Sequence, residues 1–274
     1  MAWTAGRGLR GEPHLPLGHR RSATAAEGGV TVAGDTQLGA GVSGWLAFWS
    51  RPHRVYVDDR HRRVHYAKVA DDLLALLPGP GAKVLDFGCG EALEADRVAR
   101  ACGHLYLLEA AEPVRGALEA RFAGHRNVTV LGPSGLSSLP GGSLDLVMVN
   151  SVLQYLSVEE FEHCLAVWRD KLASRGLLVL GDVLPPGSSA LADALALLRV
   201  ALRHGFALAA LGGLASLAFG DYRRLRRDLG LTCWEPGELT RRLEAADFTV
   251  ERRARNLGFN PRRMTFLARP RPKG

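Results

Sequence analysis

The residues best suited to ligand chemistry lie in one short stretch, where Asp86 leads into a turn that contains Gly88 and Gly90. The apolar residues before Asp86 predict a buried strand, and the glycines let the backbone approach a ligand closely. Such a turn usually offers N–H groups to a pyrophosphate, which a neighbouring carboxylate would repel. Leu93 also stands where a dinucleotide-binding fingerprint has its third glycine. The stretch therefore predicts a ligand with a cationic centre and disfavours NAD.

A second carboxylate, Glu109, follows the apolar run 105–108. An acid at the end of the second strand, about 20 residues after a glycine turn, is typical of ribose recognition. We expect Glu109 to accept hydrogen bonds from two ribose hydroxyls. A ligand with a ribose, a nearby positive centre and no phosphate fits S-adenosylmethionine, whose amino and sulfonium groups would lie near Asp86.

On these residues the chain resembles the class I S-adenosylmethionine-dependent methyltransferases, over about residues 69–182. The stretch VLDFGCG is similar to their first motif, LYLLEA to their second, and LDLVMVNSVLQYL to the strand and turn that follow. The resemblance implies a small-molecule methyltransferase that uses S-adenosyl-L-methionine as its cofactor. The residues expected to bind this cofactor are Asp86, Gly88, Gly90, Glu109, Ser134 and Asn150.

The chain departs from the family at two positions. Many relatives carry an acid after the third strand that contacts the adenine amine, whereas residues 132–136 are uncharged, so Ser134 or backbone atoms would replace it. Asn150 and Ser151 stand where amino-directed DNA methyltransferases have an Asn/Asp-Pro-Pro-aromatic motif. That motif is absent, which disfavours exocyclic base amines as the methyl acceptor.

Methyl transfer from a sulfonium depends mainly on alignment of the acceptor, and a base is needed only for a poorly ionised acceptor atom. The substrate-side candidates are His65, Gln154 and Tyr155. His65 follows the polar turn 60–63 and is equally explained as a solvated residue, and Tyr155 as a packing residue. No catalytic residue is assigned, and the acceptor is expected to be a small, mainly apolar molecule.

Apolar runs alternate with amphipathic stretches along the chain, which is typical of a parallel sheet covered by helices on both faces. We expect an α/β fold with a Rossmann-like doubly wound sheet, mostly parallel, with a C-terminal antiparallel hairpin and a helical insert. Helices are predicted over 64–77, 91–102 and 114–122, and from the capping box 157–160 to Gly176. After the strand that ends at Asp86, strands are predicted over 105–108, 127–131, 144–150, 177–182, 248–254 and 264–267.

The sequence predicts a tail, a domain and an insert within that domain. Residues 1–40 lack a sustained apolar period and are predicted to be a disordered tail, followed by a methyltransferase domain over 45–270. The domain includes an insert, 185–234, in which Leu191, Leu195, Leu198 and Leu202 form one helical stripe. The insert is interpreted as a buried lid, as a peripheral membrane contact through 205–227, or as a dimer contact; the uncharged run 205–220 is too short to span a bilayer.

The net charge of +7 arises in residues 251–274, which hold eight Lys or Arg against one acid. Interleaved aromatic residues are absent there, so nucleic-acid binding is not predicted. The four cysteines are scattered without His partners at ligand spacing, which indicates neither disulfides nor a metal site. The expected location is the cytoplasm, with membrane-peripheral attachment as an option, and the oligomeric state is open. The main alternative function is a non-catalytic nucleoside-binding or partner-binding module with the same fold.

Overall fold

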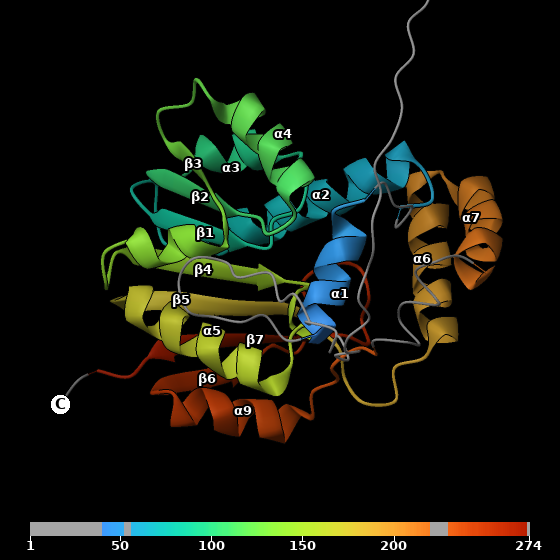
Figure 1. The fold of residues 1–274 in the computed structure, drawn as a ribbon. Helices are drawn as coiled ribbons and strands as arrows, with labels where there is room; N and C mark the ends of the chain where they lie inside the picture. Colours follow the sequence, from blue (N-terminus) through green and yellow to red (C-terminus); the bar gives the residue numbers. More distant parts are fainter. Residues whose placement is uncertain (1–39, 52–55, 220–229, 273–274) are drawn as a thin grey trace, which may run out of the picture. The chain divides into compact units, whose positions relative to one another are not determined.

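The computed structural model describes residues 40–51, 56–219 and 230–272 (Figure 1). The predicted tail 1–40 lies outside the described residues except for Ala40, as do the basic residues 223–227 of the insert. The described residues are built around one sheet.

Seven strands pair in the order β3-β2-β1-β4-β5-β7-β6. Strands β1 to β5 run parallel to one another, and β7 is antiparallel to both β5 and β6. The predicted mostly parallel sheet with a C-terminal hairpin is therefore confirmed. The strands span Lys83–Phe87 (β1), His104–Leu108 (β2), Val128–Leu131 (β3), Leu144–Asn150 (β4), Leu172–Val183 (β5), Phe248–Arg252 (β6) and Met264–Pro270 (β7). The ends of β1, β2, β4 and β5 share one edge, called the carboxyl edge below.

Alternate residues of the strands face two separate cores, because side chains of a strand point to opposite faces of the sheet. Leu85 and Val147 pack in the core that contains Trp168, whereas Val84 and Leu146 pack in the core on the other face. Helices α5 (Val158–Lys171) and α9 (Pro236–Ala245) cover the first core, and α2 (Asp59–Leu74), α3 (Ala95–Ala99) and α4 (Glu112–Phe122) cover the second. The doubly wound architecture follows from this division.

Two helix boundaries are set as the sequence signals predict. The Ser157 hydroxyl accepts from the Glu160 N–H at 3.2 Å, and the Glu160 carboxylate accepts from the Ser157 N–H at 2.7 Å, so the predicted capping box begins α5. Helix α9 begins at Pro236, because the fixed φ of proline suits the first turn of a helix and its missing N–H costs nothing there. Helix α2 begins earlier than predicted, because the Asp58 carboxylate caps it by accepting from the His61 N–H at 2.7 Å.

Two predicted boundaries are wrong. The helix expected over 91–102 is reduced to α3, because Ala92 has a φ of +41° and the chain turns before Ala95. Gly176 does not end α5, which stops at Lys171; it lies inside β5. At Gly176 a Cβ atom would lie 3.0 Å from the Leu144 carbonyl oxygen, so a glycine is required by the close approach of two strands.

The insert contains two described helices, α6 (Ala190–His204) and α7 (Ala207–Phe219), which pack against each other. In the predicted leucine stripe, Leu195 is 46% and Leu202 is 67% exposed. The buried residues of α6 are Ala196, Val200 and Ala201. Small side chains allow close approach to α7, and this cluster contacts Val64 of α2 and Phe259 of the β6–β7 connection.

Candidate functional site

The glycine turn after β1 has the backbone geometry that only glycine adopts easily. Gly88 has a φ of +69° and Gly90 a φ of +58°, both in the left-handed region. An added Cβ would lie 2.6 Å from Val152 Cγ2 at Gly88 and 2.7 Å from the Tyr66 hydroxyl at Gly90. The N–H groups of Gly88 and Cys89 donate to the Leu108 carbonyl at 2.9 and 3.1 Å, which fixes the turn against the end of β2.

Glu109 lies directly after β2 and is almost completely buried beside this turn. Its Oε2 accepts from the Gly90 N–H at 2.9 Å, and its Oε1 accepts from the Ala111 N–H at 2.7 Å. Burial raises the pKa of Glu109, and these two hydrogen bonds oppose the shift. The carboxylate is thus held in a fixed orientation at the carboxyl edge, and each oxygen retains a lone pair for a further donor.

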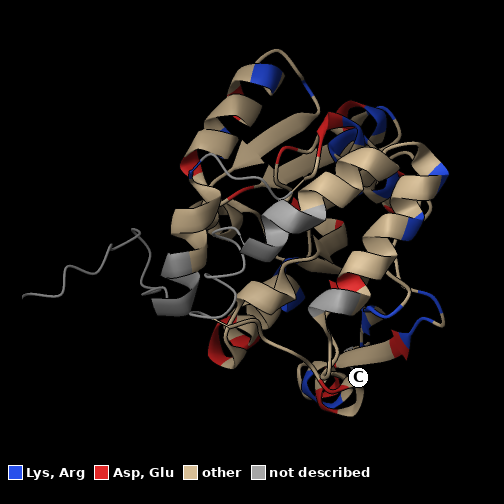
Figure 2. Cartoon of the chain, turned by 90° about the vertical axis from the view of Figure 1, so that its right-hand side faces the viewer, with Lys and Arg blue, Asp and Glu red and all other residues tan. Residues whose placement is uncertain are grey.

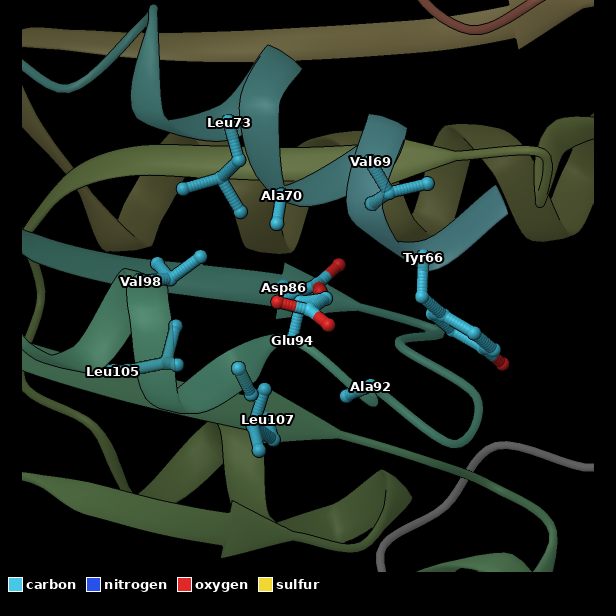
Figure 3. A pocket seen from close by; sticks show the side chains of 11 residues that line it. Tyr66, Val69, Ala70, Leu73, Asp86, Ala92, Glu94, Val98, Leu105 and Leu107 are labelled. Carbon is cyan, nitrogen blue, oxygen red and sulfur yellow. The ribbon is translucent and has the colours of Figure 1, made fainter. Parts of the chain in front are cut away.

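Asp86 lies in β1 next to the turn and lines a small cavity between α2, α3 and the strands (Figure 3). The cavity has a volume of about 20 Å³, which is room for roughly one water molecule. Burial, and then the charge of Glu109, raise the pKa of Asp86 to about 7. The two acids therefore interact across the glycine turn, and a cation near either one would favour the ionised pair.

Helix α2 closes over the turn through contacts that the sequence did not predict. The Tyr66 hydroxyl accepts from the Glu91 N–H at 2.8 Å, and Arg62 pairs with the Glu91 carboxylate at 3.1 Å. The rings of Tyr56 and His65 lie 5.4 Å apart, and His65 also packs edge-on against Tyr66 at 5.2 Å. Burial lowers the pKa of His65 to about 4, so this half-buried substrate-side candidate is a neutral imidazole.

The remaining cofactor candidates lie further along the carboxyl edge. Ser134 is exposed in the short helix η1 (Pro133–Ser138), which follows β3. Because β2 lies between β3 and β1 in the sheet, Ser134 follows a strand farther from β1 than the strand that leads to Glu109. Arg115 lies nearby, donating from one Nη atom to the carbonyls of Glu109 and Ala110, each at 3.2 Å. Asn150 ends β4, on the opposite side of β1 from Glu109.

The turn after β4 holds the other two substrate-side candidates. Gln154 and Tyr155 belong to the short helix η2 (Leu153–Tyr155), and the Tyr155 ring packs against Trp45 at 4.7 Å and Trp49 at 5.7 Å. Both tryptophans come from α1 (Ala40–Trp49), so this helix reaches the carboxyl edge. Gln154 is 7% exposed, and its Oε1 atom has no hydrogen-bond partner among the described residues.

Other kinds of site find less support in this geometry. Within residues 40–51, 56–219 and 230–272, no three His, Cys, Asp or Glu side chains converge as ligands for a metal ion. In the same ranges, none of the helices combines the length and apolarity needed to cross a membrane.

Asp86, the glycine turn and Glu109 lie in a part of the chain that matches a known protein family. Residues 85–180, from β1 into β5, match the sequence profile of a family described as a methyltransferase domain. Residues 85–180 form a methyltransferase domain. The resemblance inferred from the motifs of this domain is therefore confirmed. No curated protein matches the chain in sequence.

Solved structures show the same fold as the methyltransferase domain and its surroundings. A complex of DhpI with SAH is 16% identical, with a TM-score of 0.54 over 85% of this chain and 98% of that one. The N-methyltransferase NodS from Bradyrhizobium japonicum, bound to S-adenosyl-L-homocysteine, is 18% identical, with a TM-score of 0.52 over 83% and 96%. A SAM-dependent methyltransferase from Leishmania major is 14% identical, with a TM-score of 0.52 over 83% and 82%. The predicted fold class is thus confirmed.

Proposed function

We propose that this chain is an S-adenosylmethionine-dependent methyltransferase that acts on a small, mainly apolar molecule, and that residues 45–270 form its catalytic domain. The observation that carries the proposal is the orientation of Glu109. Its carboxylate is held by the Gly90 and Ala111 N–H groups beside the glycine turn, next to the buried acid Asp86. The matched methyltransferase domain and the SAH-bound relatives of the same fold support this assignment.

The residues at the carboxyl edge fit this cofactor in charge and in shape. The left-handed backbone at Gly88 and Gly90 brings the turn against Val152 and Tyr66 with no room for a Cβ, and two acids provide no attraction for a phosphate. Glu109 would accept from the ribose hydroxyls, and Ser134 with nearby backbone atoms would bind the adenine edge. Asp86 would hold the amino group through a water molecule or after a movement of Tyr66, because the cavity between them is small.

The cofactor supplies an activated methyl group, so the protein's contribution is to bind, orient and exclude water. Asn150 lies on the strand next to β1 and would face the methionine part of the cofactor. Tyr155, Trp45 and Trp49 would form an apolar wall for the acceptor beyond it. The pKa of His65 is lowered to about 4, which makes it a weak base, so methyl transfer would depend on alignment of the acceptor more than on proton removal by His65.

Thermal unfolding tests the cofactor assignment. S-adenosylhomocysteine at about 100 times its dissociation constant should stabilise the folded chain by about 2.7 kcal/mol and raise the melting temperature. NADH at the same concentration should leave it unchanged, because the buried acids oppose a pyrophosphate. A shift with NADH alone would overturn the proposal.

We further propose that the protein works in the cytoplasm and contacts a membrane surface through the outer face of the insert (Figure 2). All four cysteines are free thiols, which suits a reducing compartment. Leu202 is 67% and Leu208 is 87% exposed, and the neighbouring Arg199 and Arg203 are also exposed. Exposed leucines beside arginines are complementary to an anionic lipid surface, while the opposite face of α6 packs as a lid against α2.

Co-sedimentation with vesicles tests this contact. The chain should bind vesicles that contain phosphatidylglycerol, bind pure phosphatidylcholine less, and release at high salt because the attraction is screened. Leu208→Ser and Arg203→Ser should each weaken binding, whereas Arg175→Ser, an exposed arginine in β5, should not. Equal binding of all three variants would contradict the proposed surface.

A further inference from the structure

Two polar residues at the ends of β4 and β5 have an unusual backbone conformation. Ser151 has a φ of +57° and Asp182 a φ of +55°, and neither is a glycine. The Ser151 hydroxyl donates to Asp182 Oδ2 at 2.9 Å, and the Asn256 amide donates to Asp182 Oδ1 at 3.1 Å. The Asp182 N–H in turn donates to Asn256 Oδ1 at 3.2 Å. The partly exposed carboxylate of Asp182 is therefore held in one orientation from both sides.

A second, independent observation concerns Gln154. Its side chain is more than nine-tenths buried, and Oε1 is left without a hydrogen-bond donor among the described residues. A buried carbonyl oxygen in this state costs free energy unless a partner is supplied, so native proteins rarely leave one unsatisfied. The oxygen requires a donor that the described part of the protein does not provide.

The fold brings these two acceptors to the same part of the carboxyl edge. Helix η2, which carries Gln154, packs against β5. The segment 232–234 joins the two places, because the Thr232 N–H donates to the Gln154 carbonyl at 3.0 Å and the Trp234 N–H donates to the Leu184 carbonyl at 2.8 Å. Strand β4 separates β1 from β5, so Asp182 lies roughly 10 Å from the glycine turn. This is the side on which a methyl acceptor would lie.

Asp182 shares its neighbouring cation with a second acid. Arg263 pairs with Asp193 at 3.0 Å, so its positive charge is already shared with another acid. Burial raises the pKa of Asp182, and Arg263 and the hydrogen bonds from Ser151 and Asn256 lower it. A cation that reached this carboxylate would favour its ionised form.

We propose that Gln154 and Asp182 form the acceptor-side subsite and that they bind a protonated amine on an otherwise apolar acceptor. Gln154 Oε1 lacks a donor among the described residues, and the Asp182 carboxylate can accept further donors besides Ser151 and Asn256. An ammonium group offers three donors and a positive charge. The aromatic rings of Trp45, Trp49 and Tyr155 next to Gln154 suit the apolar remainder of such a molecule. The inference rests on the proposed methyltransferase function and defines its acceptor class.

Calorimetry on the full chain saturated with S-adenosylhomocysteine tests the subsite, with hexylamine, hexan-1-ol and hexanoate as probes. Hexylamine should bind about tenfold more tightly than either of the others, because only it provides a charge-assisted hydrogen bond. Asp182→Asn should remove this preference. The control is Asp247→Asn, since Asp247 has a similar φ of +62° but lies exposed before β6.

Gln154→Leu separates ligand binding from a structural role. If Gln154 serves the subsite, the variant should bind hexylamine less tightly yet have a higher melting temperature, because an unsatisfied buried oxygen is removed. Unchanged hexylamine binding in both variants, or equal affinity of the wild type for the amine and the alcohol, would overturn the subsite while leaving cofactor binding intact. Failure of the wild type to bind S-adenosylhomocysteine would overturn the proposed function instead, and the subsite with it.

Discussion

Glu109 combines two roles in one carboxylate, since it holds the glycine turn and stands at the predicted ribose position. Glu109→Ala removes hydrogen bonds to the cofactor that are worth about 1.5 to 3 kcal/mol each, so affinity for S-adenosylhomocysteine should fall at least about tenfold. Glu112→Ala, an exposed acid in the first turn of α4, is the matched control. Calorimetry that finds equal affinity in a folded Glu109→Ala variant would remove Glu109 from the site.

Tyr66 fastens α2 to the glycine turn through one hydrogen bond from the Glu91 N–H. Tyr66→Phe leaves this partly buried N–H without a partner, so the free energy of unfolding should fall by about 1 to 3 kcal/mol. Tyr106→Phe provides the comparison, because Tyr106 is a partly buried tyrosine of β2 in contact with the His104 ring. Urea denaturation measures both, and equal losses would mean that the Tyr66 contact has no special role.

Asp86 makes stability depend on pH in a defined direction. Its pKa is raised from 3.8 to about 7 in the folded chain, so between these values the folded protein holds a proton that the unfolded chain has lost. Stability should therefore fall as the pH rises through this window, by up to about 4 kcal/mol. Asp86→Asn should flatten the profile in urea denaturation between pH 5 and 8. An unchanged slope in this variant would show that Asp86 does not titrate there.

At the scale of elements, side chains that set the ends of helices can be tested by substitution. Ser157→Ala removes one half of the capping box of α5 and should lower the free energy of unfolding by about 1 kcal/mol. Ser174→Ala, at an exposed position in β5, should change it little. The variant should keep its affinity for S-adenosylhomocysteine, since α5 covers the face of the sheet and not its carboxyl edge. A stability loss no larger than that of the control would argue against the cap.

The strands of the sheet could be predicted because parallel strands are buried on both faces and appear as continuous apolar runs. Strand β4 has the predicted bounds 144–150 for this reason. The failures arise where tertiary contacts override local signals. The helix predicted over 91–102 is reduced to α3, because the chain turns at Ala92, whose carbonyl accepts a hydrogen bond from Arg121 of α4.

The same distinction applies to the candidate site. Asp86, the glycines and Glu109 could be named from the sequence because their spacing along two adjacent strands is local and regular. The contact between Asp182 and Asn256 could not, since these residues are distant in the chain and meet only through the β5–β7 pairing. The hydrogen bond from the Glu91 N–H to Tyr66 could not be predicted either, because it requires the orientation of α2.

At the scale of the whole molecule, three groups of residues at the carboxyl edge and in the insert suit three different binding partners. Acids beside β1 and β2 suit the cofactor, polar acceptors beyond β4 and β5 suit the methyl acceptor, and the exposed leucines of α6 and α7 suit a surface. The positive charges of residues 251–274 belong largely to β6, β7 and their connection, away from the glycine turn in the order of the sheet. The net positive charge of the chain therefore does not mark the candidate cofactor site.

The central claim is that the carboxyl edge binds S-adenosylmethionine. Equilibrium dialysis of the full chain with S-adenosylmethionine labelled in its methyl group tests it most directly. We predict saturable binding of one molecule per chain, displaced by S-adenosylhomocysteine and not by NADH. Absence of saturable binding, or displacement by NADH at similar concentration, would contradict the account.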